Sequence, residues 1–95
     1  MKNYMFPGVL YFIAEDGDFM LHIEDLNVFA YGDSVEEVQH NALDLVNAYV
    51  DLSLKIDCEI PTPTTFEEMV QKHPKHTILL VETVVDPVEN CVVVK

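Results

Sequence analysis

The chain has 95 residues, of which 49% are hydrophobic, so it is long enough for one domain with one core and too short for a second. Seventeen Asp and Glu residues against five Lys and Arg residues give a net charge of −12. Such a surface repels a phosphate backbone, so we expect no direct binding to DNA or RNA. The charge is typical of a well-solvated surface, and a narrower interpretation is a surface that meets a basic partner.

Two features bear on the compartment in which the chain works. The apolar stretch at residues 5–14 is too short to span a bilayer, and it has neither a basic leader nor a small-residue cleavage site. Cys58 and Cys91 are far apart in sequence and indicate neither a disulfide framework nor a zinc or redox motif. We therefore expect a cytoplasmic protein with no membrane segment.

The first third of the chain has the pattern of an antiparallel meander. Residues 8–14 are apolar at every position, which predicts an inner, central strand covered on both faces. A polar turn at residues 15–18 precedes an alternating strand at residues 19–23. A second turn at residues 24–27 leads to a short strand at residues 28–31, which Gly32 ends.

The middle of the chain predicts one long helix and one short helix. Ser34 and Glu37 form a capping box at the start of the long helix. Apolar residues then recur every three or four positions, at Val35, Val38, Ala42, Leu45, Val46, Tyr49 and Leu52, with Glu36, Gln39, Asn47 and Asp51 opposite. This pattern favours packing against the sheet, and a partner-binding face is the alternative. A proline-containing loop at residues 57–65 precedes a second capping box at Thr65, which opens a short helix that ends near His73.

The last part of the chain predicts two further strands. Residues 77–85 are rich in β-branched side chains, and residues 91–94 form a second such run. An unpaired apolar terminal strand promotes aggregation, so it either folds back on the preceding strand or pairs with a second subunit. We therefore expect a single α+β domain over residues 1–95, with the order β-β-β-α-β and an extra C-terminal strand. Since so small a domain buries little surface on its own, we expect a homodimer formed through that strand.

The sequence lacks the patterns of an enzyme. Its carboxylate pairs lie in turns or first helical turns, where solubility and the helix dipole account for them. The four histidines have no metal-ligand spacing, and the three isolated glycines form no phosphate loop. His22 lies on the polar face of its strand, so it is either exposed or at an interface. We expect no catalytic residue, no metal and no cofactor.

Residues 15–63 resemble the HicB family of antitoxins and its solo relatives in the order and spacing of several short motifs. These are the Asp16-Gly17 turn, the alternating strand 19–23, the Asp25-Leu26 turn, the Gly32-Asp33-Ser34 helix start with Glu37, the apolar helix 38–52, and the loop Ile60-Pro61-Thr62-Pro63. The resemblance implies a partial ribonuclease-H-like fold. It also implies a protein that neutralises a small basic, mRNA-cleaving toxin by covering its active surface.

The sequence departs from the family pattern at two places. The usual Pro-Gly-Cys after Asp-Leu is replaced by Asn27-Val28-Phe29, with one residue fewer before Gly32. Relatives that bind operators carry a DNA-binding segment after the last strand, whereas this sequence ends at Lys95. The second departure gives no support to DNA binding.

The resemblance and the charge together favour the antitoxin of a type II toxin–antitoxin pair, whose partner is a small basic ribonuclease toxin of the HicA type. We expect the toxin to meet an acidic surface at the two turns of the meander, formed by Glu15, Asp16, Asp18, Glu24 and Asp25. The alternatives are a stand-alone structural or adaptor module of the same fold and, ranked last, a degenerate nuclease.

Overall fold

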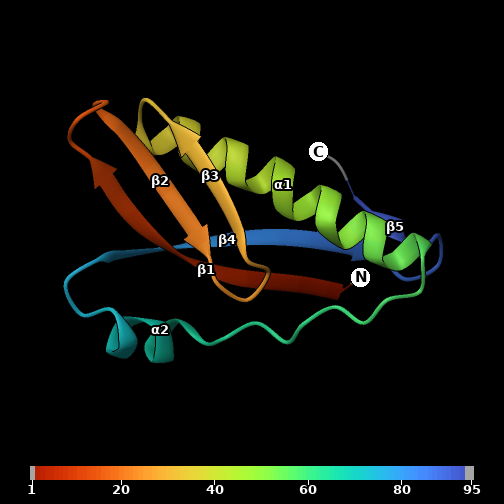
Figure 1. Ribbon diagram of the computed structural model, residues 1–95. Helices are drawn as coiled ribbons and strands as arrows, with labels where there is room; N and C mark the ends of the chain where they lie inside the picture. The colour runs from red at the N-terminus through yellow and green to blue at the C-terminus, as the bar shows by residue number, and fades with distance from the viewer. Residues whose placement is uncertain (1, 94–95) are drawn as a thin grey trace.

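The computed structural model describes residues 2–93 as one antiparallel five-stranded sheet with a helix on each face (Figure 1). The strand order is β3-β2-β1-β4-β5. The elements in chain order are β1 (Lys2–Ile13), β2 (Asp18–Ile23), β3 (Val28–Gly32), α1 (Val35–Lys55), α2 (Phe66–Lys72), β4 (Thr77–Asp86) and β5 (Cys91–Val92). The predicted α+β class and the predicted order of elements are confirmed.

Strand β1 is the central strand, as its uniformly apolar sequence predicts. It pairs with β2 from Val9 opposite His22, and with β4 from Lys2 opposite Val85. The prediction placed its start at residue 8, whereas the strand begins at Lys2. Pro7 suggests a break, but β2 pairs only from Val9 onward, so β1 has a single neighbouring strand at Pro7. A strand edge tolerates the missing N–H of proline.

Helix α1 packs its most buried side chains on one face of the sheet. Its start is capped as predicted, because the Ser34 Oγ accepts a hydrogen bond from the Glu37 N–H at 3.1 Å. The buried side chains of α1 are those of Val38, Ala42, Val46, Val50 and Ser53. The apolar side chains of this buried set pack with side chains of the sheet, such as those of Phe6, Leu21 and Ile23, in the main core. Full burial of each Val, Leu, Ile or Phe side chain contributes about 1.5–3 kcal/mol to the free energy of folding.

The predicted buried stripe of α1 is wrong at three positions and its predicted solvent face at two, one of which is Asp51, whose Oδ1 accepts a hydrogen bond from the Val92 N–H of β5 at 3.5 Å. Leu45, Tyr49 and Leu52 are exposed, whereas the Asn47 Oδ1 faces the sheet and accepts a hydrogen bond from the Thr83 Oγ1 at 2.7 Å. On the flank of the exposed residues, the Asn41 Nδ2 donates to the Tyr31 backbone oxygen at 2.7 Å. That flank therefore faces β3, an edge strand of only five residues, which is too short to cover the helix.

Helix α2 covers part of the opposite face of the sheet. The Thr65 Oγ1 accepts from the Glu68 N–H at 3.2 Å, which confirms the predicted helix cap at Thr65, and it donates to the Glu68 Oε1 at 3.1 Å, where the capping box predicted a bond from the Thr65 N–H. Met69 is buried against Val9 and Ile78, in a second and smaller core. Because side chains of β1 are buried on both sides of the sheet, its sequence is apolar at consecutive positions.

The C-terminal strand folds back on the strand before it. In β5, Val92 lies opposite Val85 and Cys91 opposite Asp86 of β4. Of the two arrangements expected for this strand, folding back is the one present. Residues 94 and 95, which the sequence analysis placed in or after the strand, lie outside the described residues, and the expected homodimer through this strand stays a prediction.

Candidate functional site

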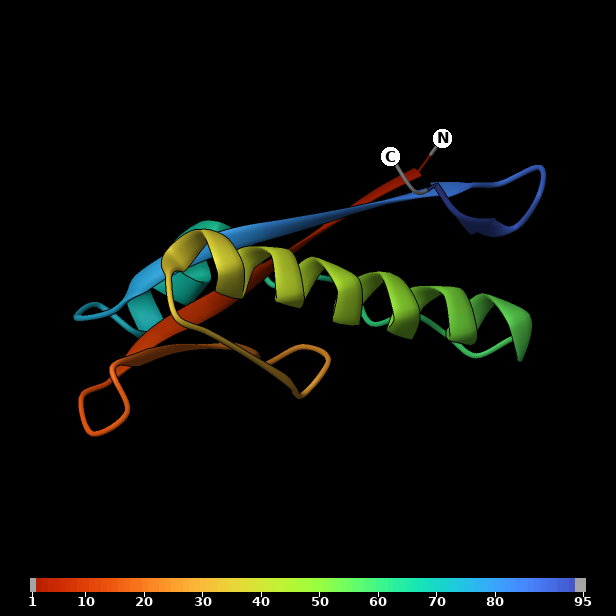
Figure 2. The same ribbon diagram turned by 90° about the horizontal axis from the view of Figure 1, so that it is seen from above.

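Three of the five predicted partner-binding residues lie together at the tip of the β1–β2 hairpin. Glu15 and Asp16 are exposed and Asp18 is half-buried. The turn closes through hydrogen bonds from the Asp16 and Gly17 N–H groups to the Ile13 backbone oxygen, at 3.2 and 2.9 Å. Gly17 has a φ of 69°, which glycine adopts without strain. The tip protrudes beyond the end of the sheet (Figure 2), so its carboxylates are accessible to a partner.

Two further carboxylates, which the sequence analysis did not include, approach this tip from the start of α1. A side-chain hydrogen bond with Asp33 raises the pKa of Asp18, and burial and the negative charges of Asp33, Asp16 and Glu37 raise it further. Strand pairing causes this approach. Phe19 lies opposite Gly32 in an antiparallel pair, so Asp18, which precedes Phe19, comes close to Asp33, which follows Gly32. The register of the β2–β3 hairpin was the signal that would have identified Asp33 and Glu37.

The tip carboxylates have no basic partner in the described part of the chain. The ion pairs of residues 2–93 involve Glu24, Asp44 and Asp51 instead. We call Glu15, Asp16, Asp18, Asp33 and Glu37 the acidic tip. Carboxylates that repel one another and lack a counter-charge form a surface that a cationic group from another molecule would stabilise.

Glu24, the fourth predicted residue, is paired within the chain. Its Oε1 lies 2.7 Å from the Lys72 Nζ and its Oε2 lies 2.8 Å from the His73 Nε2. Hydrogen bonds with Lys72 and, second to it, with His73 lower the pKa of Glu24 against the opposing effect of burial. The side chain of Glu24 therefore connects the β2–β3 turn to the C-terminal end of α2.

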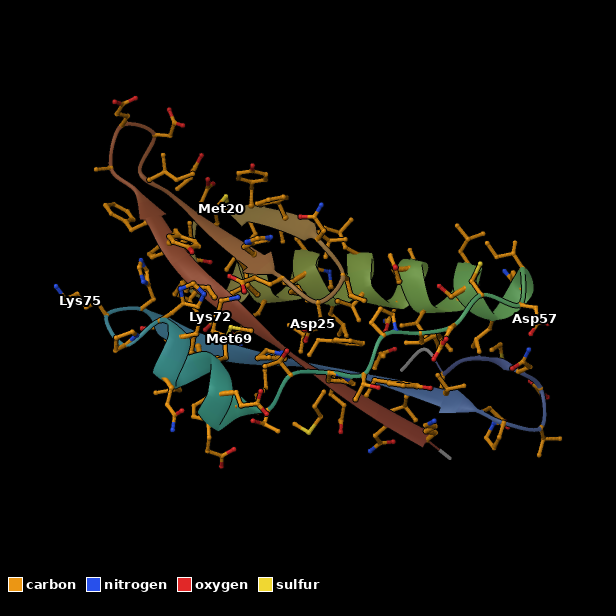
Figure 3. All side chains as sticks on the ribbon, turned by 60° about the horizontal axis from the view of Figure 1, so that its bottom comes forward. Met20, Asp25, Asp57, Met69, Lys72 and Lys75 are labelled. Carbon is orange, nitrogen blue, oxygen red and sulfur yellow. The ribbon has the colours of Figure 1, made fainter. Side chains whose placement is uncertain are left out.

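Asp25, the fifth predicted residue, holds the long loop between the helices. Its Oδ2 accepts from the Thr64 N–H at 2.8 Å, and its Oδ1 accepts from the Thr64 Oγ1 at 2.6 Å. Figure 3 shows Asp25 beside the loop that leads to α2, with Lys72 on α2 nearby. The loop at residues 57–65 has no regular structure of its own, so this pair of bonds fixes its path across the sheet.

The five predicted residues therefore do not form one surface. The acidic tip and the β2–β3 turn lie at opposite ends of the six-residue β2, roughly 17 Å apart. Glu15, Asp16 and Asp18 are free for a partner, whereas Glu24 and Asp25 are occupied by contacts within the chain. The sequence places all five in turns, but it does not distinguish a solvent-facing carboxylate from one that is bonded internally.

His22, which was expected to be exposed or at an interface, is half-buried on the face of the sheet away from α1. Its ring stacks on that of Phe29, with centroids 4.2 Å apart and an interplanar angle of 5°. Its Nε2 is buried without a hydrogen-bond partner in the protein. The stacking accounts for the position of the ring and assigns it no chemical role.

Within residues 2–93, no three His, Cys, Asp or Glu side chains gather closely enough to hold a metal ion. No helix in the described part of the chain is long and apolar enough to cross a membrane. The acidic tip is therefore the strongest candidate site that the described residues provide.

Comparisons with known proteins found similarity in structure only. No protein-family model matches the chain, and no curated protein matches it in sequence. The crystal structure of the N-terminal domain of the Burkholderia pseudomallei antitoxin HicB superposes with a TM-score of 0.73 at 20% identity, and the match covers 86% of this chain and 98% of that domain. The fold is that of a HicB-like N-terminal domain.

The full-length HicB structure from the same organism gives the same result. It matches with a TM-score of 0.72 and 18% identity, over 87% of this chain. The match spans 62% of the length of that antitoxin. The HicB-like resemblance inferred from the short motifs of the sequence is thus confirmed at the level of the fold, although fewer than a quarter of the residues are identical.

Proposed function

We propose that this chain acts as an antitoxin-like inhibitor that binds a small basic, mRNA-cleaving toxin of the HicA type and covers its RNA-binding surface. The observation that carries the proposal is an unneutralised acidic tip on a HicB-like fold. A toxin that binds RNA presents positive potential to phosphate groups, and a protein of net charge −12 competes for that potential.

Within this proposal, the acidic tip makes the contact with the toxin and the β2–β3 turn supports it indirectly. Glu15, Asp16 and Asp18 are exposed or half-exposed without basic partners, so they keep their charge available for association. Glu24 and Asp25 maintain the positions of α2 and of the loop before it. The protein works by binding in the cytoplasm, without catalysis, cofactor or metal.

The test of the site is the kinetics of association with the product of the neighbouring gene, which the proposal expects to be a small basic protein. The variant Glu15→Lys/Asp16→Lys/Asp18→Lys reverses three charges at the tip. Electrostatic steering is a long-range effect, so we expect association to slow by about tenfold or more at low salt and to lose most of its salt dependence.

A matched control separates the tip from the overall charge. The variant Glu59→Lys/Glu67→Lys/Glu89→Lys changes the net charge by the same amount at three exposed positions away from the tip. It should retain most of the association rate and its salt dependence. Equal effects of the two triple variants would remove the tip from the proposal, and the absence of any complex would remove the proposal itself.

A further inference from the structure

A row of exposed apolar side chains runs along α1 beside its buried face. Leu45, Tyr49 and Leu52 of α1 are 41%, 36% and 58% exposed, and Ile56, the C-cap residue of the helix, is 59% exposed. Residues three and four apart lie on one side of a helix, so these four form a continuous row about 16 Å long. We call them the α1 row. An apolar row of this kind marks an interaction surface. The row shares no residue with the acidic tip, so the proposed toxin contact does not account for it.

We propose that the α1 row is the contact between two copies of this chain, which pair with their α1 helices antiparallel about a twofold axis. The members of the row are separated by four, three and four residues, a spacing that reads the same in both directions. A twofold axis at the middle of the row therefore places Leu45 against Ile56 of the other copy, and Tyr49 against Leu52.

The charges beside the row permit two copies to approach here. The Lys55 Nζ lies 2.7 Å from the Asp51 Oδ2, so the charge of Lys55 is neutralised. Asp51 itself lies on the side of α1 toward β5, away from the row, because its Oδ1 accepts a hydrogen bond from the Val92 N–H at 3.5 Å. In the antiparallel arrangement the same flanks of the two helices face each other. Lys55 of one copy then lies within about 3 Å, along the helix axis, of Asp44 of the other, which adds an attraction between opposite charges.

A second copy fits this row better than a basic partner does. The carboxylates that lack a counter-charge lie on the acidic tip, at Asp16, Asp18 and Asp33, and a basic protein is drawn there. The α1 row offers apolar contact with little net charge, which suits an equally neutral row. One helix face gives a contact at the small end of specific interfaces, so we expect a reversible dimer with a dissociation constant of about 10 to 100 μM.

This inference is independent of the toxin, so the chain alone is sufficient for its first test. Sedimentation equilibrium of the purified protein should show a monomer–dimer equilibrium that strengthens between about 50 and 500 mM NaCl. Salt screens the repulsion between two molecules of net charge −12 and leaves the apolar contact intact. Binding of a basic partner at the acidic tip would respond to salt in the opposite direction.

Substitution within the row tests the surface. Leu52→Asn should raise the dimer dissociation constant by about tenfold or more, because truncation of a central apolar contact is costly. Val88→Asn is the matched control, since Val88 is 91% exposed in the β4–β5 turn and outside the row. It should leave the dissociation constant unchanged, and circular dichroism should show both variants folded.

Cysteine cross-linking tests the antiparallel orientation. In a Cys58→Ser/Cys91→Ser background, a mixture of Leu45→Cys and Ile56→Cys proteins should form disulfide-linked heterodimers. Neither protein alone should do so, because the two copies of each position lie about 16 Å apart along the axis, too far for a disulfide.

Three outcomes would overturn the proposal. The first is a chain that stays monomeric up to about 1 mM, far above the range of specific dimers of this size. The second is a dimer that Leu52→Asn does not weaken. The third is self-cross-linking of the Leu45→Cys protein, which indicates a parallel pair. Should Leu52→Asn weaken only the complex with a basic protein, the row belongs to that partner and the dimer is excluded.

Discussion

Asp18 and Glu24 lie at opposite ends of β2, and their surroundings shift their pKa values in opposite directions. The carboxyl group of Asp33 and nearby negative charges raise the pKa of Asp18. Lys72 and His73 lower the pKa of Glu24. An ionised Asp18 therefore opposes folding whereas an ionised Glu24 favours it, which is the difference expected if Asp18 serves binding, as proposed, and Glu24 serves stability.

Replacement of Glu24 by glutamine should destabilise the fold in a pH-dependent way. The lowered pKa means that folding favours the ionised form, so this contribution is complete above about pH 5 and is lost as the pH falls through the folded-state pKa. We expect Glu24→Gln to reduce the free energy of unfolding by about 1 kcal/mol at pH 7, since Lys72 is largely exposed. Urea unfolding at pH 7 and at about pH 3.5 should show the difference from wild type shrinking at the lower pH. A difference that is the same at both values would contradict this account, and Glu67→Gln, in the exposed first turn of α2, is the control.

Asp18→Asn should have the opposite effect on stability. A raised folded-state pKa means that the charged form is disfavoured in the folded protein, so its penalty develops as the pH rises above the ordinary value and is complete at neutral pH. We expect a higher melting temperature for Asp18→Asn than for wild type at pH 7, and no gain at about pH 3, where both states are protonated. Slower association with a basic partner should accompany the gain. A lower melting temperature at pH 7 would show that Asp18 contributes to the fold.

At the scale of elements, the junction of β3 and α1 depends on the absence of a side chain at Gly32. A Cβ atom at this position would lie 2.6 Å from the Val38 backbone nitrogen and 3.0 Å from the Glu37 carbonyl carbon. Both neighbours belong to the helix backbone, which cannot rotate away as a side chain does. The strand and the helix therefore approach each other as closely as they do only with glycine at this point.

Gly32→Ala should accordingly destabilise the protein by about 2–3 kcal/mol, as overpacking against backbone does. Ser34→Ala is the comparison at the same junction, because it removes the helix cap without adding volume, and it should be milder, at about 1 kcal/mol. Urea unfolding of the two variants gives the ranking. The reverse order would show that the junction has room for a side chain.

The elements that local patterns define were predictable from the sequence. The caps at Ser34 and Thr65 each satisfy a backbone N–H three residues later, so both helix starts follow from sequence alone. The side of α1 that is buried depends on the width of the sheet beneath it. The helix sequence does not indicate how wide the sheet beneath it is. The prediction therefore placed Leu45 and Tyr49 in the core, whereas both are exposed.

The candidate site was predictable in part for the same reason. The β1–β2 turn is local, and Glu15 and Asp16 are exposed there as a polar turn predicts, whereas their contact with a partner stays a prediction. Asp33 joins them through the pairing of β2 with β3, which is a tertiary relation. Glu24 and Asp25 were indistinguishable in sequence from free carboxylates, because their partners Lys72 and Thr64 lie about 40 or more positions away.

At the scale of the whole molecule, charge is distributed unevenly over the surface. The acidic tip protrudes at one end of the sheet without counter-charges, whereas the α1 row consists of exposed apolar side chains. A protein of net charge −12 can in this way attract a basic protein at one place and a copy of itself at another. The acidic tip and the α1 row are thus separate surfaces of one small domain, and each can be tested without the other.

The central claim is that the chain inhibits a basic ribonuclease, and one measurement tests it most directly. The protein is co-purified with the product of its neighbouring gene, and cleavage of mRNA by that product is measured with and without the chain. We expect a stable complex, near-complete suppression of cleavage at equimolar chain, and recovery of cleavage with the Glu15→Lys/Asp16→Lys/Asp18→Lys variant. Cleavage that continues at full rate with excess chain, or a neighbouring product that neither binds the chain nor cleaves RNA, would contradict the antitoxin function and leave a HicB-like fold with another use.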